Sequence, residues 1–125
     1  MIYTLTANPA VDMTVFSDGL KKNKVNRTKN AVYTGNGKGV NVSLVLKRFG
    51  ITSTVLGFFG GFSGEFIISE CEKKGLFVNP VMIDDTTRIY CFMKDNTSNS
   101  TEKIVEYVFN LGGSKNTYPY TASHF

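Results

Sequence analysis

Glycines are the residues of this chain whose spacing suits the binding of a small anion. The stretch "TGNGKGVNVSLVLKRFG" (34–50) carries a glycine at every second position and then runs into an apolar helical pattern. Free N–H groups and the dipole at a helix N-terminus favour negative or hydroxyl-rich ligands. From the residues alone, a plain glycine turn into a helix is an equally good interpretation.

Two phosphate-binding templates do not fit this stretch. A Walker A loop would need glycine where Val32 stands, and Ser or Thr where Gly39 stands. The dinucleotide fingerprint G-x-G-x-x-G would need its last glycine where Val40 or Val42 stands. What remains is a helix entrance opened by glycines.

Cysteine and histidine chemistry is also disfavoured. The two cysteines, Cys71 and Cys91, lie far apart, and His124 is the only histidine. Zinc sites, Ser-His-Asp triads and Cys-His pairs need closer or richer sets, so we expect no metal site. Both thiols are expected to be buried and reduced.

Length and charge indicate one cytoplasmic domain. The chain has 125 residues and a net charge of +4, with no apolar run long enough to cross a membrane and no secretory signal. Basic residues crowd residues 21–29, but no interleaved aromatic motif accompanies them, so we expect a solvated loop and no nucleic-acid or membrane partner.

The elements that must position these residues alternate between strands and helices. Strands are predicted at 2–7, 13–17, 26–34, 52–59, 78–83 and 87–94, and helices after Gly39 and within 60–75. This alternation favours an α/β fold with a largely parallel sheet. The polar strands between 13 and 34 fit the alternation poorly, so they are expected to form a small accessory sheet over the ligand edge.

Both helices carry specific expectations. The spacing of Val42, Val45, Leu46 and Phe49 predicts that these residues form the inward face of the first helix. Ser63 is expected to cap the second helix, with Phe66, Ile67 and Cys71 facing inward.

The last thirty residues differ in character from the rest. The polar run 96–101 predicts a loop or linker. Residues 102–113 fit either an amphipathic helix or a strand, and 114–125 show no clear element.

Five motifs, in order and at compatible spacing, resemble one known family. "TLTANPAVD", "VNR", "GNGKGVNVSLVLKRFG", "LGFFGGFSGEFI" and "DDTTRI" look like the amino-terminal third of the ribokinase-like (PfkB) carbohydrate kinases. Within that family the chain is most similar to bacterial 1-phosphofructokinases and to tagatose-6-phosphate kinases. The resemblance covers 1–95 and leaves 96–125 as a divergent tail.

The resemblance implies a fold and a function. The fold is the amino-terminal part of a ribokinase-like sandwich, a mostly parallel sheet with flanking helices, plus a β lid sheet with strands within about 13–34 and 86–94. The implied enzyme transfers phosphate from ATP, with Mg²⁺, to fructose 1-phosphate and gives fructose 1,6-bisphosphate. Tagatose 6-phosphate is the alternative substrate, and lid strands imply a homodimer.

The resemblance also implies six substrate-binding residues. Asp12 is the carboxylate that contacts sugar hydroxyls. The sugar is held by three residues of the glycine-rich motif, Gly37, Lys38 and Asn41. The phosphate that the substrate carries is approached by two arginines, Arg88 and Arg27. Each has a plainer interpretation. Asp12 would cap a turn after Pro9, Arg88 would be a surface residue on a strand, and Lys38 would point into solvent.

Two departures from the family limit the prediction. Asn36 stands where the family usually has glycine, so its side chain is expected to intrude near the sugar. No "GAGD" motif occurs in the 125 residues, so no catalytic base and no nucleotide-binding residue is assigned. We therefore expect the isolated chain to be catalytically inactive. A truncated or frame-shifted gene, an unfinished gene model and a genuine short protein all fit the sequence, and a non-catalytic sugar-phosphate-binding remnant is the alternative function.

Overall fold

Seven strands and two helices make up the described part of the chain. The computed structural model describes residues 1–28, 30–97 and, as a backbone strand, 100–105. In chain order the elements are β1 (Ile2–Thr6), β2 (Ala10–Ser17), β3 (Asn30–Asn36), α1 (Lys38–Arg48), β4 (Ser53–Gly60), α2 (Gly61–Lys73), β5 (Phe77–Ile83), β6 (Arg88–Asp95) and β7 (Ser100–Val105).

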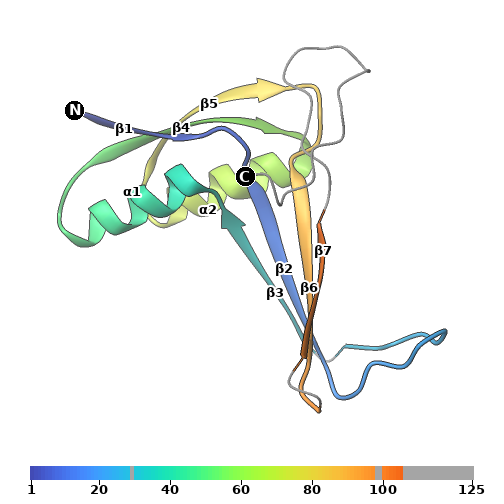
Figure 1. Ribbon diagram of the computed structural model, residues 1–125. Coiled ribbons are helices and arrows are strands. Elements are labelled where there is room, and N and C mark those ends of the chain that lie inside the picture. Colours follow the sequence, from blue (N-terminus) through green and yellow to red (C-terminus); the bar gives the residue numbers. More distant parts are fainter. Residues whose placement is uncertain (29, 98–99, 106–125) are drawn as a thin grey trace.

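The strands form two separate sheets. The first is parallel, with the order β1-β4-β5, and both helices lie against one of its faces (Figure 1). The second has the order β3-β2-β6-β7, in which β2 and β6 are parallel and the outer strands are antiparallel to them. The expected α/β fold with a parallel sheet is therefore confirmed, and an additional sheet extends away from it.

The core lies between the parallel sheet and the helices. Its fully buried side chains include Val40 of α1, Val55 and Phe59 of β4, and Ile67 and Cys71 of α2. Strand alternation places Val55 and Phe59 on the helix side of β4, as expected for a sheet covered on that face.

The inward face predicted for α1 is wrong. Val42, Val45 and Phe49 are 51%, 49% and 76% exposed, and the buried residues of the helix are Gly39, Val40 and Ser43. The Ser43 hydroxyl is hydrogen-bonded to the hydroxyls of Thr4 and Ser53, at 2.7 and 2.8 Å. A buried hydroxyl is tolerated when it is paired, so small and polar residues can form the packed face of this helix.

Close packing of α1 on β1 requires its glycines. A Cβ on Gly39 would stand 2.5 Å from the backbone carbon of Leu5, and one on Gly37 would stand 2.3 Å from Thr6 Cγ2. The Val40 N–H also donates to Thr6 Oγ1 at 3.0 Å. The alternating glycines therefore allow the first turn of α1 to pack closely against the carboxyl end of β1.

A second close junction fixes the start of β6. Gly60 and Thr87 exchange two hydrogen bonds, Thr87 N–H to Gly60 O at 2.9 Å and Gly60 N–H to Thr87 Oγ1 at 3.0 Å. Ser63 donates to the Thr87 carbonyl from within α2, whose N-cap is Gly60, so the predicted Ser63 cap is wrong. Because Thr87 is fully buried, the next residue, Arg88, is placed by a rigid junction.

The polar run 96–101 contains a turn at 96–97 and, at its end, the first residues of β7. β7 pairs with β6 in antiparallel register from Asp95–Ser100 to Tyr90–Val105. Residues 100–105 therefore form a strand, one of the two alternatives, whereas 106–125 lie outside the described residues. Within the described part of the chain, neither helix has the length and apolar character that a membrane crossing requires.

Candidate functional site

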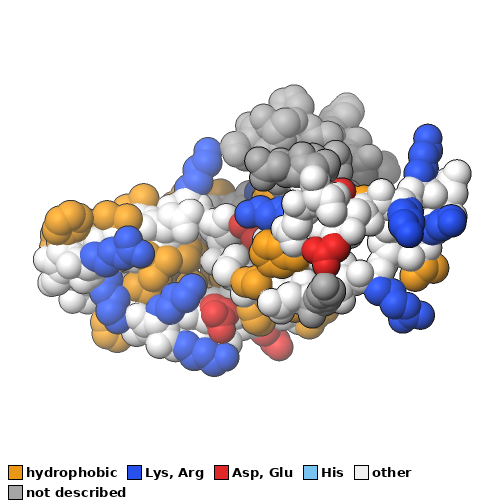
Figure 2. Space-filling model, turned by 90° about the horizontal axis from the view of Figure 1, so that it is seen from below, with side chains coloured by type: hydrophobic (Ala, Val, Ile, Leu, Met, Phe, Trp, Pro, Cys, Tyr) orange, Lys and Arg blue, Asp and Glu red, His pale blue; other side chains and the backbone are white. Residues whose placement is uncertain are grey.

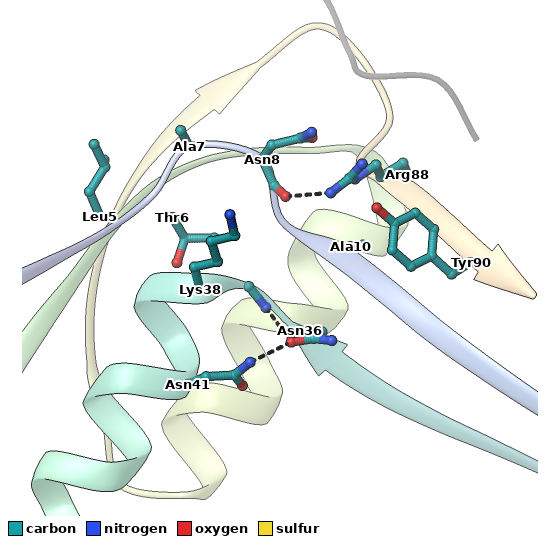
Figure 3. Close-up of a pocket in the computed structure, with 11 residues that line it drawn as sticks. Leu5, Thr6, Ala7, Asn8, Ala10, Asn36, Lys38, Asn41, Arg88 and Tyr90 are labelled. Atoms are coloured by element: carbon teal, nitrogen blue, oxygen red, sulfur yellow. Dashed lines mark hydrogen bonds between the residues drawn. The ribbon is translucent and has the colours of Figure 1, made fainter. Parts of the chain in front are cut away.

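Four of the six predicted site residues line one cavity. The cavity has a volume of about 340 Å³ and lies where β1 ends, α1 begins and β6 starts (Figure 3). Gly37, Lys38, Asn41 and Arg88 contribute to its wall. Residues as far apart as Gly37 and Arg88, 51 positions in the sequence, are thus brought to the carboxyl end of a parallel strand, where open α/β sheets bind ligands.

Arg88 is buried and held by backbone carbonyls. Its Nη2 donates to Asn8 O at 3.1 Å and its Nε to Pro9 O at 3.4 Å, while its Nη1 is buried without a partner. The guanidinium carbon lies 4.6 Å from the centre of the Tyr90 ring. These contacts orient the guanidinium and leave one of its nitrogens without a hydrogen-bond partner.

Burial shifts the pKa values of this pair. Loss of water lowers the pKa of Arg88 from its ordinary value, against the charges of Tyr90 and Asp12, which raise it. Burial also raises the pKa of Tyr90, an effect that the Arg88 charge opposes and Asp12 reinforces. At neutral pH the site therefore presents a cation beside a neutral phenol.

Asp12 does not line the cavity but is hydrogen-bonded to a residue that does, Asn36. It lies within β2, paired with Thr34 of β3 and Tyr90 of β6. Its Oδ2 accepts a hydrogen bond from Asn36 Nδ2 at 2.7 Å, and its Oδ1 is buried without a partner. Asn36, rather than Asp12, lines the cavity.

The glycine-rich segment presents amides to the same wall. Asn36 Oδ1 accepts from the Gly37 N–H at 2.7 Å and from Asn41 Nδ2 at 2.9 Å. Lys38 is exposed, and its side chain extends from the first turn of α1 toward the loop after β1 (Figure 3). Lys38 therefore adds positive charge to the cavity.

Arg27 is not brought into this cavity. It lies in the loop between β2 and β3 and lines a different hollow of about 280 Å³ with Phe16, Asp18 and Lys21. That loop is at the far end of the second sheet in Figure 1, and basic side chains gather at the same end in Figure 2. Its contact with a substrate phosphate stays a prediction.

Asn8 and Tyr90 are cavity residues that the sequence did not single out. Both atoms of the Asn8 side-chain amide are buried without a hydrogen-bond partner. Unpaired buried polar atoms are rare and call for an explanation, and those of Asn8, Asp12 and Arg88 lie together here. The available signal for Asn8 was its position directly after a buried strand.

The described residues do not supply a metal centre. Among them, no three or more His, Cys, Asp or Glu side chains lie close enough to hold a metal ion. The cavity offers a guanidinium, an ammonium and several amides, a set suited to a phosphate joined to a polyol rather than to a cation.

Comparisons with known proteins point the same way. The sequence model of the "pfkB family carbohydrate kinase" matches residues 5–119, past the point at which the motif resemblance ends. A D-tagatose-1-phosphate kinase of Klebsiella oxytoca is 45% identical over 95 residues, 76% of this chain and 31% of the relative. A 1-phosphofructokinase of Borreliella burgdorferi is 40% identical over 71% of this chain and 29% of the relative.

A solved structure shares the arrangement of strands and helices. Phosphofructokinase-2 from Escherichia coli, in complex with fructose-6-phosphate, has a TM-score of 0.79 and 25% identity, over 90% of this chain and 37% of that protein. This likeness confirms the expected fold class. The chain spans about a third of the length of the relatives it matches.

Proposed function

Because the chain belongs to the PfkB family of carbohydrate kinases, we propose that it carries the sugar-phosphate-binding part of a 1-phosphofructokinase. That enzyme transfers a phosphoryl group from MgATP to the free primary hydroxyl of fructose 1-phosphate and yields fructose 1,6-bisphosphate. The proposal is supported most directly by Arg88, a buried arginine that lines the same cavity as the glycine-rich motif and whose Nη1 has no hydrogen-bond partner.

The residues of the cavity divide the substrate between them. Arg88 binds the phosphate that the sugar already carries, with Lys38 adding charge. Asn41 and the Gly37 backbone hold the sugar hydroxyls in the cavity. Asp12 is the carboxylate that we assign to the same hydroxyls, although Asn36, which is bonded to it, lines the cavity in its place. Together they orient the sugar for attack by its free primary hydroxyl, since transfer depends on alignment of that oxygen with the incoming phosphate.

ATP supplies the phosphoryl group and Mg²⁺ offsets its charge during transfer. We assign no described residue to either, because no metal-ligand cluster is formed and no "GAGD" motif occurs in the sequence. We propose that these 125 residues alone bind sugar phosphate without turnover. Formation of fructose 1,6-bisphosphate by the purified 125-residue chain, followed in a coupled assay, would contradict this.

Tagatose 1-phosphate is the second candidate substrate. It is favoured by the 45% identity to a D-tagatose-1-phosphate kinase, whose name places the phosphate at C1 rather than at the C6 position of tagatose 6-phosphate. Fructose and tagatose differ in configuration at one ring carbon, so calorimetry of both 1-phosphates and of tagatose 6-phosphate on one protein preparation ranks the three substrates.

A homodimer through the second sheet is also proposed. Its outer strand β3 exposes Val32 and Tyr33, at 45% and 53%, and an exposed edge strand offers unpaired backbone groups to a partner. Light scattering after size exclusion measures the mass. If a Tyr33→Lys variant still forms a dimer with unchanged affinity, β3 is not part of the dimer interface.

The binding test compares three ligands. Calorimetry should give a dissociation constant for fructose 1-phosphate, weaker binding of inorganic phosphate and weaker binding still of fructose. Arg88→Ala should weaken fructose 1-phosphate binding about 10- to 100-fold, since a charge-assisted hydrogen bond contributes roughly 1.5–3 kcal/mol. Arg48→Ala, at the opposite end of α1, is the matched control and should bind normally.

An Arg27→Ala variant measured alongside decides the role of the loop arginine. If Arg27→Ala binds fructose 1-phosphate as tightly as the unmodified chain, that residue has no part in the site within a single copy of the chain. If Arg88→Ala also binds normally, the proposed phosphate contact is wrong.

A further inference from the structure

The Asn36 side chain is hydrogen-bonded to the same groups that bind the sugar hydroxyls in the proposed function. Its carboxamide lies at the end of β3 and is bonded to Gly37 N, Asn41 Nδ2 and Asp12 Oδ2, at 2.7, 2.9 and 2.7 Å. These partners come from the N-cap of α1, the first turn of α1 and β2. One side chain thus connects three residues expected to contact sugar hydroxyls, and Figure 3 shows its bond to Asn41.

The orientation of both amides follows from their partners. A backbone N–H can only donate, so the atom of Asn36 that faces Gly37 is the oxygen. The nitrogen of Asn36 then faces the Asp12 carboxylate, which accepts, and Asn41 must present its own nitrogen to Asn36 Oδ1. The set is satisfied in this arrangement alone, because a flip of either amide would place like atoms together.

Hydrogen-bond capacity then limits what remains for a ligand. Asn36 Oδ1 has two lone pairs, and both are used. The Asp12 oxygens are also withheld from the cavity, since Oδ2 is bonded to Asn36 and Oδ1 is buried. Asn36 lines the cavity where Asp12 does not, so a sugar meets one amide N–H donor in place of a carboxylate acceptor.

We propose that Asn36 is a specificity-determining residue that competes with the sugar for Asp12, Gly37 and Asn41. The proposal rests on the proposed function and concerns the hydroxyl part of the ligand only. Arg88 donates to Asn8 O and Pro9 O, outside the Asn36 network. The Asp12 charge acts on Arg88 and is kept when the Asn36 side chain is removed, so phosphate binding should change little. The side chain therefore weakens recognition of the sugar while leaving recognition of its phosphate unchanged.

The test removes the carboxamide and measures two ligands. Calorimetry on the 125-residue chain should show that Asn36→Gly binds fructose 1-phosphate about tenfold more tightly, because up to three groups become available to sugar hydroxyls. Inorganic phosphate should bind as before. A purely structural role for Asn36 would lower thermal stability without changing the ratio of the two affinities.

A double-mutant cycle with Asp12→Asn sharpens the result. Asparagine at position 12 still accepts from Asn36, so this variant should keep the network and lose less than about threefold in sugar affinity. In the Asn36→Gly background, where the sugar reaches Asp12 directly, the same change should remove most of the gain. Equal effects of Asp12→Asn in both backgrounds would overturn the competition.

The control is a carboxamide with a similar network elsewhere. Asn26 accepts from Lys21 N–H and donates to the Lys21 and Lys24 carbonyls in the loop after β2. Asn26→Gly should change neither affinity.

Three outcomes separate this inference from the proposed function. If the unmodified chain binds fructose 1-phosphate and Asn36→Gly binds it no better, only the role of Asn36 is overturned. Binding by Asn36→Gly but not by the unmodified chain supports the role of Asn36 and contradicts sugar-phosphate binding by the unmodified chain. If neither protein binds any sugar phosphate, the proposed function fails and this inference fails with it.

Discussion

Arg88 is held in place before any ligand binds. Two backbone carbonyls accept from its Nη2 and Nε, Tyr90 lies against its plane, and the side chain is almost wholly buried. Arginine suits this position because its flat, always charged group bonds in several directions at once. A lysine would keep the charge and lose that geometry.

Arg88→Lys should therefore lower the free energy of unfolding by about 1–3 kcal/mol, the range for a buried polar group left unpaired. Urea denaturation followed by circular dichroism measures the change. Arg48→Lys on the exposed end of α1 is the control, and it should stay within about 0.5 kcal/mol of the unmodified chain. An Arg88→Lys protein as stable as this control would show that the two carbonyl contacts contribute little.

Gly39 is limited by space rather than by backbone conformation. A methyl group there would overlap the Leu5 backbone at 2.5 Å, and a strand backbone cannot give way as a side chain can. We expect Gly39→Ala to destabilise the fold by roughly 2–3 kcal/mol or more, measured by the same denaturation.

Gly50 provides the comparison for Gly39. It has φ +74° and no atom within 4 Å of an added Cβ, so Gly50→Ala carries only the cost of the left-handed conformation, about 1 kcal/mol. If Gly50→Ala were the more damaging of the two, the close packing of α1 on β1 would not be what requires glycine.

At this scale, the motif pattern predicted residues that the fold brings to one cavity, and it missed the hydrogen bonds between them. Gly37, Lys38, Asn41 and Arg88 were predicted from short local motifs, and the fold brings them together. The bridge from Asn36 to Asp12 spans 24 residues, and the unpaired amide of Asn8 depends on what surrounds it. Neither leaves a periodic or spaced pattern for a sequence to reveal.

Among the elements, α1 shows most clearly what hydrophobic spacing misses. The existence and the ends of the helix follow from the glycines and the basic last turn. Its buried face does not, because a helix seated closely on a strand needs small residues at the contact. Ser43 satisfies its hydroxyl with Thr4 and Ser53, and the larger Val42 and Val45 then face outward.

Paired valine truncations test which face of α1 is buried. Val40→Ala should cost about 2 kcal/mol, because a fully buried side chain leaves a cavity when it is shortened. Val45→Ala, at a half-exposed position of the same helix, should cost less than about 0.5 kcal/mol. Thermal denaturation of both variants shows which loses more stability. A larger loss for Val45→Ala would mean that the face predicted from the spacing is the buried one.

The buried cysteine of α2 gives a chemical measure of the same packing. Cys71 is 2% exposed, and burial raises the pKa of its thiol, against a lowering by Lys74. Because the thiolate is the reactive form, its alkylation should begin at higher pH than for an ordinary thiol and should be slow in the native state. Mass spectrometry after iodoacetamide treatment should show partly exposed Cys91 modified first.

Denaturant supplies the control for that experiment. In urea, both cysteines should react at similar rates, since burial no longer separates them. Rapid native labelling of Cys71 would mean that α2 opens from the sheet readily, and the shared core of α2 and β4 would then be less stable than its packing indicates.

At the scale of the whole molecule, the helices of the described residues cover one face of the parallel sheet only. Parallel sheets are normally covered on both faces, yet the face opposite α1 and α2 carries apolar side chains in register across its strands. Tyr3, Thr54 and Phe77 form one row, and Phe58 lies beside Val81 in another. Tyr3, Phe77 and Val81 are each more than half exposed, so this face is large and apolar enough to favour association.

We therefore expect the 125-residue chain to self-associate through this face in a concentration-dependent manner. Sedimentation velocity at increasing concentration should show growing mass. Phe77→Glu combined with Val81→Lys should suppress the growth, since charges on an apolar face oppose its burial. Val45→Lys on the outer face of α1 changes an equally exposed apolar residue elsewhere and should leave association unchanged. If the Val45 variant were as monodisperse as the double variant, a general gain in charge would explain the effect, and the open sheet face would have no special part in it.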